Sequence, residues 1–166
     1  MRMELIQPFI NAADAVFSEM LQAPTKINDL SMDEETYRRK GVAAHILFKG
    51  DIEGRVVLDI APEVAYKIAS HLTGGTVNEG EQIARETVCE LANMVIGNAV
   101  TQLNDRGFQF KVFPPALLTA EQCAKAGHDS EATVLCFETP CGNVYLNIAM
   151  HYHARRSRER APMPVG

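Results

Sequence analysis

The sequence predicts a single α+β domain in which about three helices pack on a mostly antiparallel sheet. Three segments carry apolar residues at helical spacing, and at least five others alternate apolar and polar residues between turn signals. The chain has 166 residues, with 46% hydrophobic and 22% charged, which is the balance of an ordinary globular domain. We therefore assign residues 1–153 to one domain and residues 154–166 to a basic, proline-containing flexible tail.

The three predicted helices differ in length and in how they end. The first covers residues 5–21, and Pro8 has to lie in its first turn, where a missing N–H has no intrahelical partner. A short helix is expected over residues 62–72, stopped by the glycines that follow it. The longest covers about residues 81–105 and is closed by Gly107.

Alternating apolar residues predict the strands of the sheet. The predicted strands cover residues 42–48, 55–60, 108–113, 133–137 and 144–151. Turn residues join the first two and the last two into hairpins, and residues 144–151 are a candidate edge strand. Residues 25–40 are consistent with a strand that ends in a loop, and residues 120–131 with a loop.

Charge and composition exclude several classes of protein. No apolar run approaches the ~20 residues of a membrane-spanning helix, and the first residues do not resemble a signal peptide, so we expect a cytoplasmic protein with no membrane contact. The net charge of −5 argues against nucleic-acid binding, although four arginines lie between Arg155 and Arg160. The four cysteines form no Cys-x-x-Cys pair, and we expect reduced thiols and no metal site.

The longest predicted helix carries a polar stripe opposite its apolar face. On a helical wheel, Glu86, Glu90, Asn93 and Gly97 fall within about 60° of arc. Asn is a poor residue for a helix interior, and a Gly there costs about 1 kcal/mol relative to Ala. From the wheel alone, a solvated helix face is the more ordinary explanation of a polar stripe. Helix packing could explain Gly97, and Asn98 lies where it would hydrogen-bond within the helix layer.

The same helix carries a family resemblance. The run from Glu90 to Ala99, Glu-Leu-Ala-Asn-Met-Val-Ile-Gly-Asn-Ala, resembles the active-site helix of the CheX branch of the CheC/FliY/CheX family of chemotaxis phosphatases. Residues 5–10, 54–58 and 63–69 resemble other parts of that family. One Glu-x-x-Asn helix, as here, is typical of the CheX branch, whereas CheC and FliY carry two. The sequence departs from the family at Glu86, where Asp or Ser is usual, and at Ala116, where Pro is expected.

The resemblance implies a CheC/CheX-like fold and a function in two-component signalling. A CheX-type protein hydrolyses the aspartyl phosphate of a CheY-like receiver domain of a response regulator. By that resemblance Asn93 orients the attacking water and Glu90 pairs with the receiver's conserved Lys. From their places on the same stripe, we assign Glu86 and Gly97 to contact with the partner. The expected protein is a homodimer without a cofactor of its own, and Mg²⁺ is expected in the receiver. A non-catalytic receiver-binding adaptor and a structural homodimer of the same fold stay open as alternatives.

Overall fold

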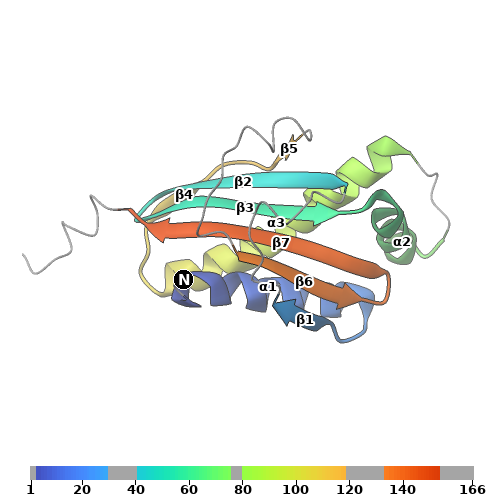
Figure 1. Cartoon of the computed structure of the whole chain (residues 1–166), viewed down its shortest axis with the longest axis horizontal. Coiled ribbons are helices and arrows are strands. Elements are labelled where there is room, and N and C mark those ends of the chain that lie inside the picture. Colours follow the sequence, from blue (N-terminus) through green and yellow to red (C-terminus); the bar gives the residue numbers. More distant parts are fainter. Residues whose placement is uncertain (1–2, 30–40, 76–79, 119–132, 154–166) are drawn as a thin grey trace, which may run out of the picture.

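Three helices and seven strands make up the described part of the chain (Figure 1). The structure is a computed structural model that describes residues 3–29, 41–75, 80–118 and 133–153. In chain order the elements are α1 (Met3–Leu21), β1 (Lys26–Asp29), β2 (Val42–Gly50), β3 (Ile52–Ile60), α2 (Pro62–Thr73), α3 (Glu81–Asp105), β4 (Phe110–Val112), β5 (Ala116–Leu118), β6 (Thr133–Thr139) and β7 (Gly142–Tyr152). The α+β prediction is confirmed, while the predicted loop at 120–131, the tail at 154–166 and residues 30–40 lie outside the described residues.

All the strands belong to one antiparallel sheet. Its order is β1-β6-β7-β3-β2-β4, and β5 also pairs with β2. β7 pairs with β3 along one side and with β6 along the other, so the prediction that residues 144–151 form an edge strand is wrong. The edge assignment followed from the sheet-edge dimer of the family that the sequence resembles, and the residues of the strand do not themselves indicate its neighbours. In the structure Asn147 is only 3% exposed and Ala149 only 1%. Both faces of this central strand are buried.

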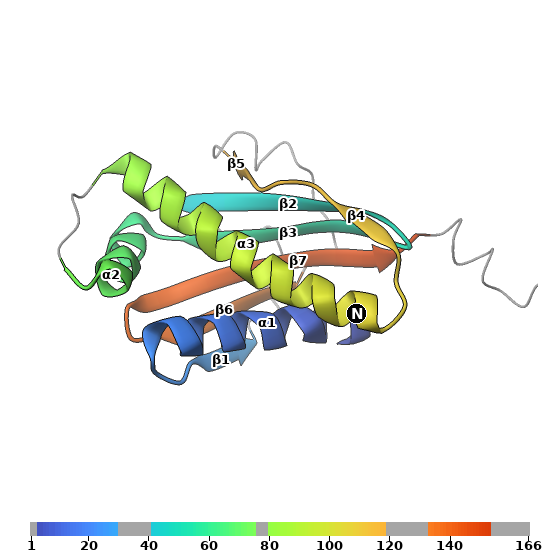
Figure 2. The same cartoon turned by 180° about the vertical axis from the view of Figure 1, so that it is seen from behind.

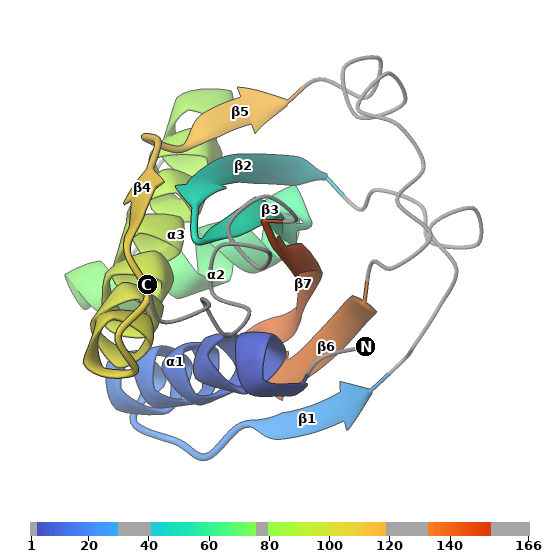
Figure 3. The ribbon, with the colours of Figure 1, turned by 90° about the vertical axis from the view of Figure 1, so that its left-hand side faces the viewer.

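The helices cover one face of the sheet and one of its ends. Figure 2 shows α3 running diagonally across that face beside α1, with α2 at the end from which α3 starts. Seen along the sheet in Figure 3, α1 and α3 lie on the same side of it. Phe9 of α1 meets Phe48 of β2 edge to face at 5.7 Å between ring centroids, one of the contacts that close the core. No helix among the described residues is long and apolar enough to cross a bilayer.

Helix ends agree with the expected signals. α3 has the predicted bounds, and Gly107, at φ 92°, lets the chain turn back so that its N–H donates to the Asn104 carbonyl at 2.9 Å. α2 runs one residue further than expected and ends at Gly74, which adopts the left-handed conformation. The strand predicted over residues 108–113 is shorter in the structure, where β4 covers only Phe110–Val112. The sequence did not indicate β5, because Pro114 and Pro115 suggested a break, yet the chain pairs with β2 again directly after them.

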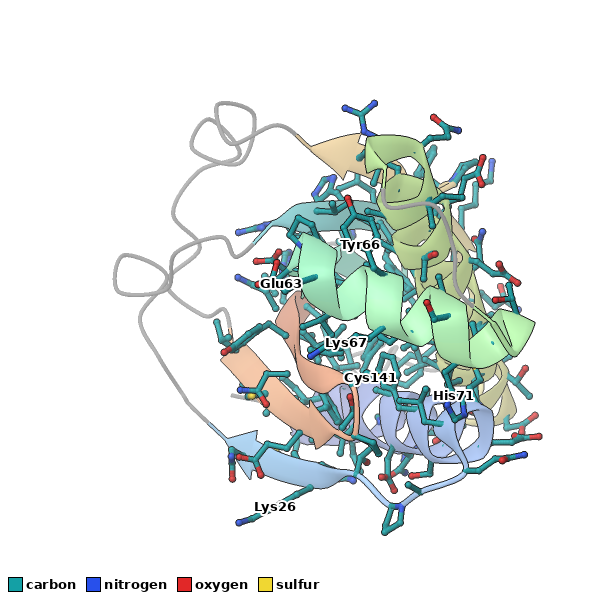
Figure 4. The ribbon with its side chains drawn as sticks, turned by 90° about the vertical axis from the view of Figure 1, so that its right-hand side faces the viewer. Lys26, Glu63, Tyr66, Lys67, His71 and Cys141 are labelled. Atoms are coloured by element: carbon teal, nitrogen blue, oxygen red, sulfur yellow. The ribbon has the colours of Figure 1, made fainter. Side chains whose placement is uncertain are left out.

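α2 packs on the turn between β6 and β7 (Figure 4). Gly142 in this turn has φ 128°, and a Cβ there would lie 2.7 Å from Val64 Cγ2, so a side chain is excluded by both backbone and packing. Lys67 and Cys141 lie close together on this side of the molecule. Burial raises the pKa of the Cys141 thiol, and the neighbouring Lys67 charge opposes that shift.

Asp51, between β2 and β3, joins three parts of the chain. Its N–H donates to the Gln109 carbonyl and its carboxylate accepts the Gln109 N–H, both at 2.8 Å. Its carbonyl accepts the N–H of His153 at 3.0 Å, just beyond the end of β7. The segment that follows α3 and the end of the last strand are therefore held at one corner of the sheet.

Pro8 is not in the first turn of α1, as the sequence suggested, because the helix begins at Met3. A proline this far into a helix leaves the carbonyl four residues earlier without its usual donor. That carbonyl belongs to Glu4, and it accepts a hydrogen bond from Arg106 Nη1 at 2.7 Å. The residue that follows α3 therefore replaces the N–H that Pro8 lacks.

This compensation predicts an energetic coupling between Pro8 and Arg106. We expect Arg106→Met to lower the free energy of unfolding by about 1 kcal/mol, since a charged donor to a backbone carbonyl is lost. In a Pro8→Ala background the N–H of the introduced alanine supplies that carbonyl, so the same change should cost less. Urea unfolding of the four proteins measures the coupling. Equal losses in both backgrounds would contradict this explanation.

His45 on β2 predicts a pH dependence of stability. Its Nε2 is buried and has no hydrogen-bond partner among the residues that the structure describes, and burial together with the Arg55 charge lowers the pKa of its imidazole below 6.5. Below about pH 6.5 the unfolded chain binds a proton that the folded chain refuses, so stability falls as pH decreases. Unfolding at pH 7.5 and 5.5 should show a smaller loss for His45→Leu than for the wild-type protein. An identical loss in both proteins would rule out His45 as the cause.

Candidate functional site

The predicted polar stripe lies on the exposed face of α3, opposite the buried face of the helix. Figure 2 shows α3 from the side of the sheet that it covers. All four of its residues, Glu86, Glu90, Asn93 and Gly97, are exposed. The opposite face of the helix is at most 1% exposed and comprises Ala84, Val88, Leu91, Ala92, Val95, Ala99 and Leu103. The wheel therefore assigned both faces correctly, and the stripe is accessible to another molecule.

Glu90 and Asn93 form the centre of the stripe. Residues three apart on a helix have Cβ atoms about 5–6 Å from each other, so a carboxylate and a carboxamide project side by side. Within the ranges that the structure describes, neither side chain has a hydrogen-bond or ion-pair partner. Nothing in the described fold occupies these two groups, and both can bind a partner from outside.

Glu86 differs from Glu90 in having a local partner. Its Oε1 accepts a hydrogen bond from Gln82 Nε2 at 2.8 Å, one turn earlier in α3. This bond holds the Glu86 carboxylate along the helix surface and uses part of its capacity to accept hydrogen bonds. Glu86 can contribute negative charge to the surface, but Glu90 is the carboxylate that is free to pair.

Gly97 has no packing reason to be a glycine. No atom of the described residues lies within 4 Å of the position that a Cβ would take there. Its backbone is ordinary helix, so no left-handed conformation requires Gly either. The alternative that helix packing selects Gly97 is therefore not supported by the described fold, and the residue weakens α3 without an internal benefit.

Asn98 belongs to a chain of side-chain amides that joins α3 to α1. Gln102 Nε2 donates to the Pro8 carbonyl at 3.4 Å and to Asn98 Oδ1 at 3.0 Å. Gln102 Oε1 in turn accepts from Asn11 Nδ2 at 3.5 Å. The expected role of Asn98 in the helix layer is confirmed, and the amide chain holds α3 at a set orientation next to α1.

Sequence reasoning missed two residues beside the stripe. Met94 follows Asn93 and is 40% exposed, an unusual place for a large apolar side chain. Thr101 is exposed one turn beyond Gly97, and its Oγ1 donates back to the Gly97 carbonyl at 3.1 Å. The helical wheel could have identified Met94, because it is an apolar residue on the polar side of an amphipathic helix. The bond from the Thr101 hydroxyl to the helix backbone could not be predicted, because it depends on the side-chain rotamer.

The described residues around the stripe include neither an activated cysteine nor a group of metal ligands. Cys89 precedes Glu90, is half-buried, and has a thiol whose pKa is raised by burial, so it is held protonated. Cys136 is buried in β6, and Cys89, Cys136 and Cys141 are free thiols. In the described ranges no three His, Cys, Asp or Glu side chains gather to hold a metal ion. The chemistry available on the stripe is that of two carboxylates, of which Glu86 already accepts a bond from Gln82, and one carboxamide.

Solved structures share this fold. A CheC-like superfamily protein from Shewanella sp. PV-4 superposes with a TM-score of 0.73 at 21% identity, covering 91% of this chain and 99% of its own. The chemotaxis protein CheX from Vibrio vulnificus gives a TM-score of 0.71 at 23% identity, covering 89% of this chain and 99% of its own. By architecture the chain is therefore a CheC-like α+β domain.

The sequence comparisons identify the family. The model of the family "Chemotaxis phosphatase CheX" matches residues 42–138, more than half of the chain, and the chain belongs to this family. The CheY-P phosphatase CheX of Thermotoga maritima is 30% identical over 71 residues, which span 42% of this chain and only 46% of that protein. The crystal structure of the CheX-CheY-BeF3-Mg²⁺ complex from Borrelia burgdorferi gives a TM-score of 0.70 at 29% identity, covering 90% of this chain and 99% of the matched chain.

Proposed function

We propose that this protein is a cytoplasmic phosphatase that hydrolyses the aspartyl phosphate of a CheY-like receiver domain. The observation that carries the proposal is the pair Glu90 and Asn93, exposed, adjacent and without partners in the described fold. The family description supports the activity, and the Thermotoga relative is named a CheY-P phosphatase. The Borrelia complex, in which a CheX is bound to CheY, supports a receiver domain as the partner.

The substrate needs little from the enzyme. An aspartyl phosphate is a mixed anhydride, so its hydrolysis requires an in-line water and stabilised phosphoryl charge rather than a strong nucleophile. We expect the receiver to supply Mg²⁺ and a conserved Lys, and this protein to contribute no cofactor. The expected Mg²⁺ agrees with the presence of Mg²⁺ and BeF3 in the Borrelia complex.

Asn93 is proposed to position the attacking water. A carboxamide is too weak a base to remove a proton near neutral pH, but its oxygen can accept a hydrogen bond from water while its NH₂ donates to a phosphoryl oxygen. A carboxamide fixed in this way on the phosphoryl oxygen holds the water in line with the bond that breaks, between phosphorus and the Asp oxygen. The aspartate carboxylate and inorganic phosphate are the products.

Glu90 is proposed to pair with the receiver's Lys. The pair forms only in the complex, where both charges lose water, and it would set the position of Asn93 against the phosphoryl group. Glu86 lies one turn earlier and adds negative charge to the same surface, so we assign it to partner contact and steering. Gly97 completes the predicted contact surface one turn beyond Asn93.

A receiver-binding adaptor without turnover is the second candidate. It is favoured by Glu86 and Ala116, the two positions at which the sequence departs from the family pattern, and an intact Asn93 favours the enzyme. A homodimer also stays a prediction. Among the described strands the sheet edges are β1 and the β4–β5 side, so a dimer built by edge pairing would use one of these rather than β7.

Replacing Asn93 should separate catalysis from binding. We expect Asn93→Ala to slow phosphate release from a Mg²⁺-loaded, phosphorylated receiver by about 100-fold, or about 3 kcal/mol, because the attacking water loses the hydrogen bond that positions it. Affinity for the receiver should change much less, since only one neutral hydrogen bond to the phosphoryl group is lost with the water contact. Phosphate release and binding of the BeF3-loaded receiver measure the two quantities separately.

Asn104→Ala is the matched control for this variant. Asn104 is an exposed Asn on the same helix, three turns beyond Asn93, and no role is assigned to its side chain. Its replacement should leave phosphate release unchanged. If wild-type protein binds the receiver without accelerating phosphate release, the adaptor is the better description.

Replacing Glu90 should affect both binding and turnover. Glu90→Ala removes the partner of a buried Lys, so we expect affinity for the receiver to fall about tenfold or more and phosphate release to fall with it. Binding by the variant should also depend less on ionic strength, because one charge pair is gone. Titrations at about 50 and 300 mM salt test this; parallel salt dependence in wild type and variant would exclude the ion pair.

A further inference from the structure

Gly97 is a position on the exposed surface of α3 that carries no side chain and has no described atom within 4 Å of where a Cβ would lie, and we call this position the notch. Its helical neighbours are Asn93 and Met94 on one side and Val100 and Thr101 on the other, three or four residues away. Met94 is 40% exposed, and Val100 is partly buried against the core. Since the Thr101 hydroxyl is bonded back to the Gly97 carbonyl, its methyl group is left for the surface.

The exposed surface of α3 therefore changes character along the helix. From Glu86 to Asn93 it presents two carboxylates and a carboxamide, whereas around Gly97 it presents a thioether chain, methyl groups and bare backbone. Because Gly97 lowers helix stability and serves no internal contact, the notch has no explanation within the described fold. A molecule that approaches the helix backbone closely at this point would explain it.

We propose that an apolar backbone segment of the receiver domain crosses α3 at this notch, on the side of the phosphorylated Asp away from the Lys. The inference rests on the proposed function, because it places the phosphoryl group at Asn93 and the Lys at Glu90. Gly97 lies ~10 Å beyond Glu90 along the helix axis. The helix then binds the receiver in one direction, with charge at its N-terminal half and close backbone contact at its C-terminal half.

The shape and chemistry of the notch determine which receiver residues can contact Gly97. A glycine without neighbours admits main chain or a small aliphatic side chain, and Met94 can adapt to its shape. A charged side chain would lose its hydration here without gaining a partner, because the Thr101 hydroxyl is already used within the helix. The receiver segment at Gly97 should therefore carry small or methyl-bearing residues.

Filling the notch tests the inference. Gly97→Ala should raise the melting temperature by about 2–4 °C, because Ala favours helix, yet weaken binding of a BeF3- and Mg²⁺-loaded CheY-like receiver by about tenfold. Gly97→Leu should weaken binding by about 100-fold or more while the protein stays folded. Stability and affinity thus move in opposite directions, which a merely structural glycine would not produce.

Asn104→Leu provides the control, since it adds an apolar side chain to the same stripe ~10 Å beyond the notch and should leave binding unchanged. Wild-type affinity in Gly97→Leu would overturn the inference, as would a lower melting temperature in Gly97→Ala or an equal loss in Asn104→Leu. If Asn93→Ala still abolishes turnover in that case, the proposed function stands and only the notch fails. Wild-type protein that neither binds nor dephosphorylates receivers would reject both.

Discussion

The burial of one face of α3 is the constraint on which the site depends. Residues such as Leu91 and Val95 are packed between the sheet and the other helices, so α3 cannot roll about its axis without exposing them. The amide chain through Gln102 adds a polar connection to α1 on the flank of the helix. Glu90 and Asn93 are thus aimed outward by groups that never touch a partner. The packing of the helix alone therefore sets the spacing of the two polar side chains, and no hydrogen bond to either side chain within the described fold is needed.

The two long helices also compensate for each other's irregularities. Pro8 leaves an unpaired carbonyl in α1, and Arg106, just after α3, donates to it. The end of α3 is held a second time by the bonds between Gln109 and Asp51, which lead into the sheet. The helix that carries the candidate site is therefore fixed at its C-terminal end by two connections of different kinds. Both lie several turns away from Glu90, and neither competes with it for hydrogen bonds.

The sequence was sufficient where one periodic pattern determined the environment of a residue. The division of α3 into an apolar and a polar face was predicted, because a helix long enough to span the sheet repeats its pattern many times. The family resemblance then selected Glu90 and Asn93 from a surface that spacing alone could not distinguish from ordinary solvated helix. β7 was misjudged because an alternating pattern does not reveal a strand's neighbours, and its place between β3 and β6 is set by pairing with two other segments. Pro8 was misplaced because its compensation comes from Arg106, far along the chain, which no local pattern can indicate.

The hydrogen bond between the His153 N–H and the Asp51 carbonyl has a consequence for where the folding unit stops. Apolar alternation in β7 fades at Met150, which would suggest an earlier boundary. A chain that ended at Met150 would lose the His153 N–H that donates to the Asp51 carbonyl. The loss would weaken the corner of the sheet at which Asp51 also bonds Gln109. We therefore expect a fragment that ends at His153 to be more stable than one that ends at Met150, because the pairing of His151 and Tyr152 with β3 and the His153 amide bond lie beyond the final buried side chain.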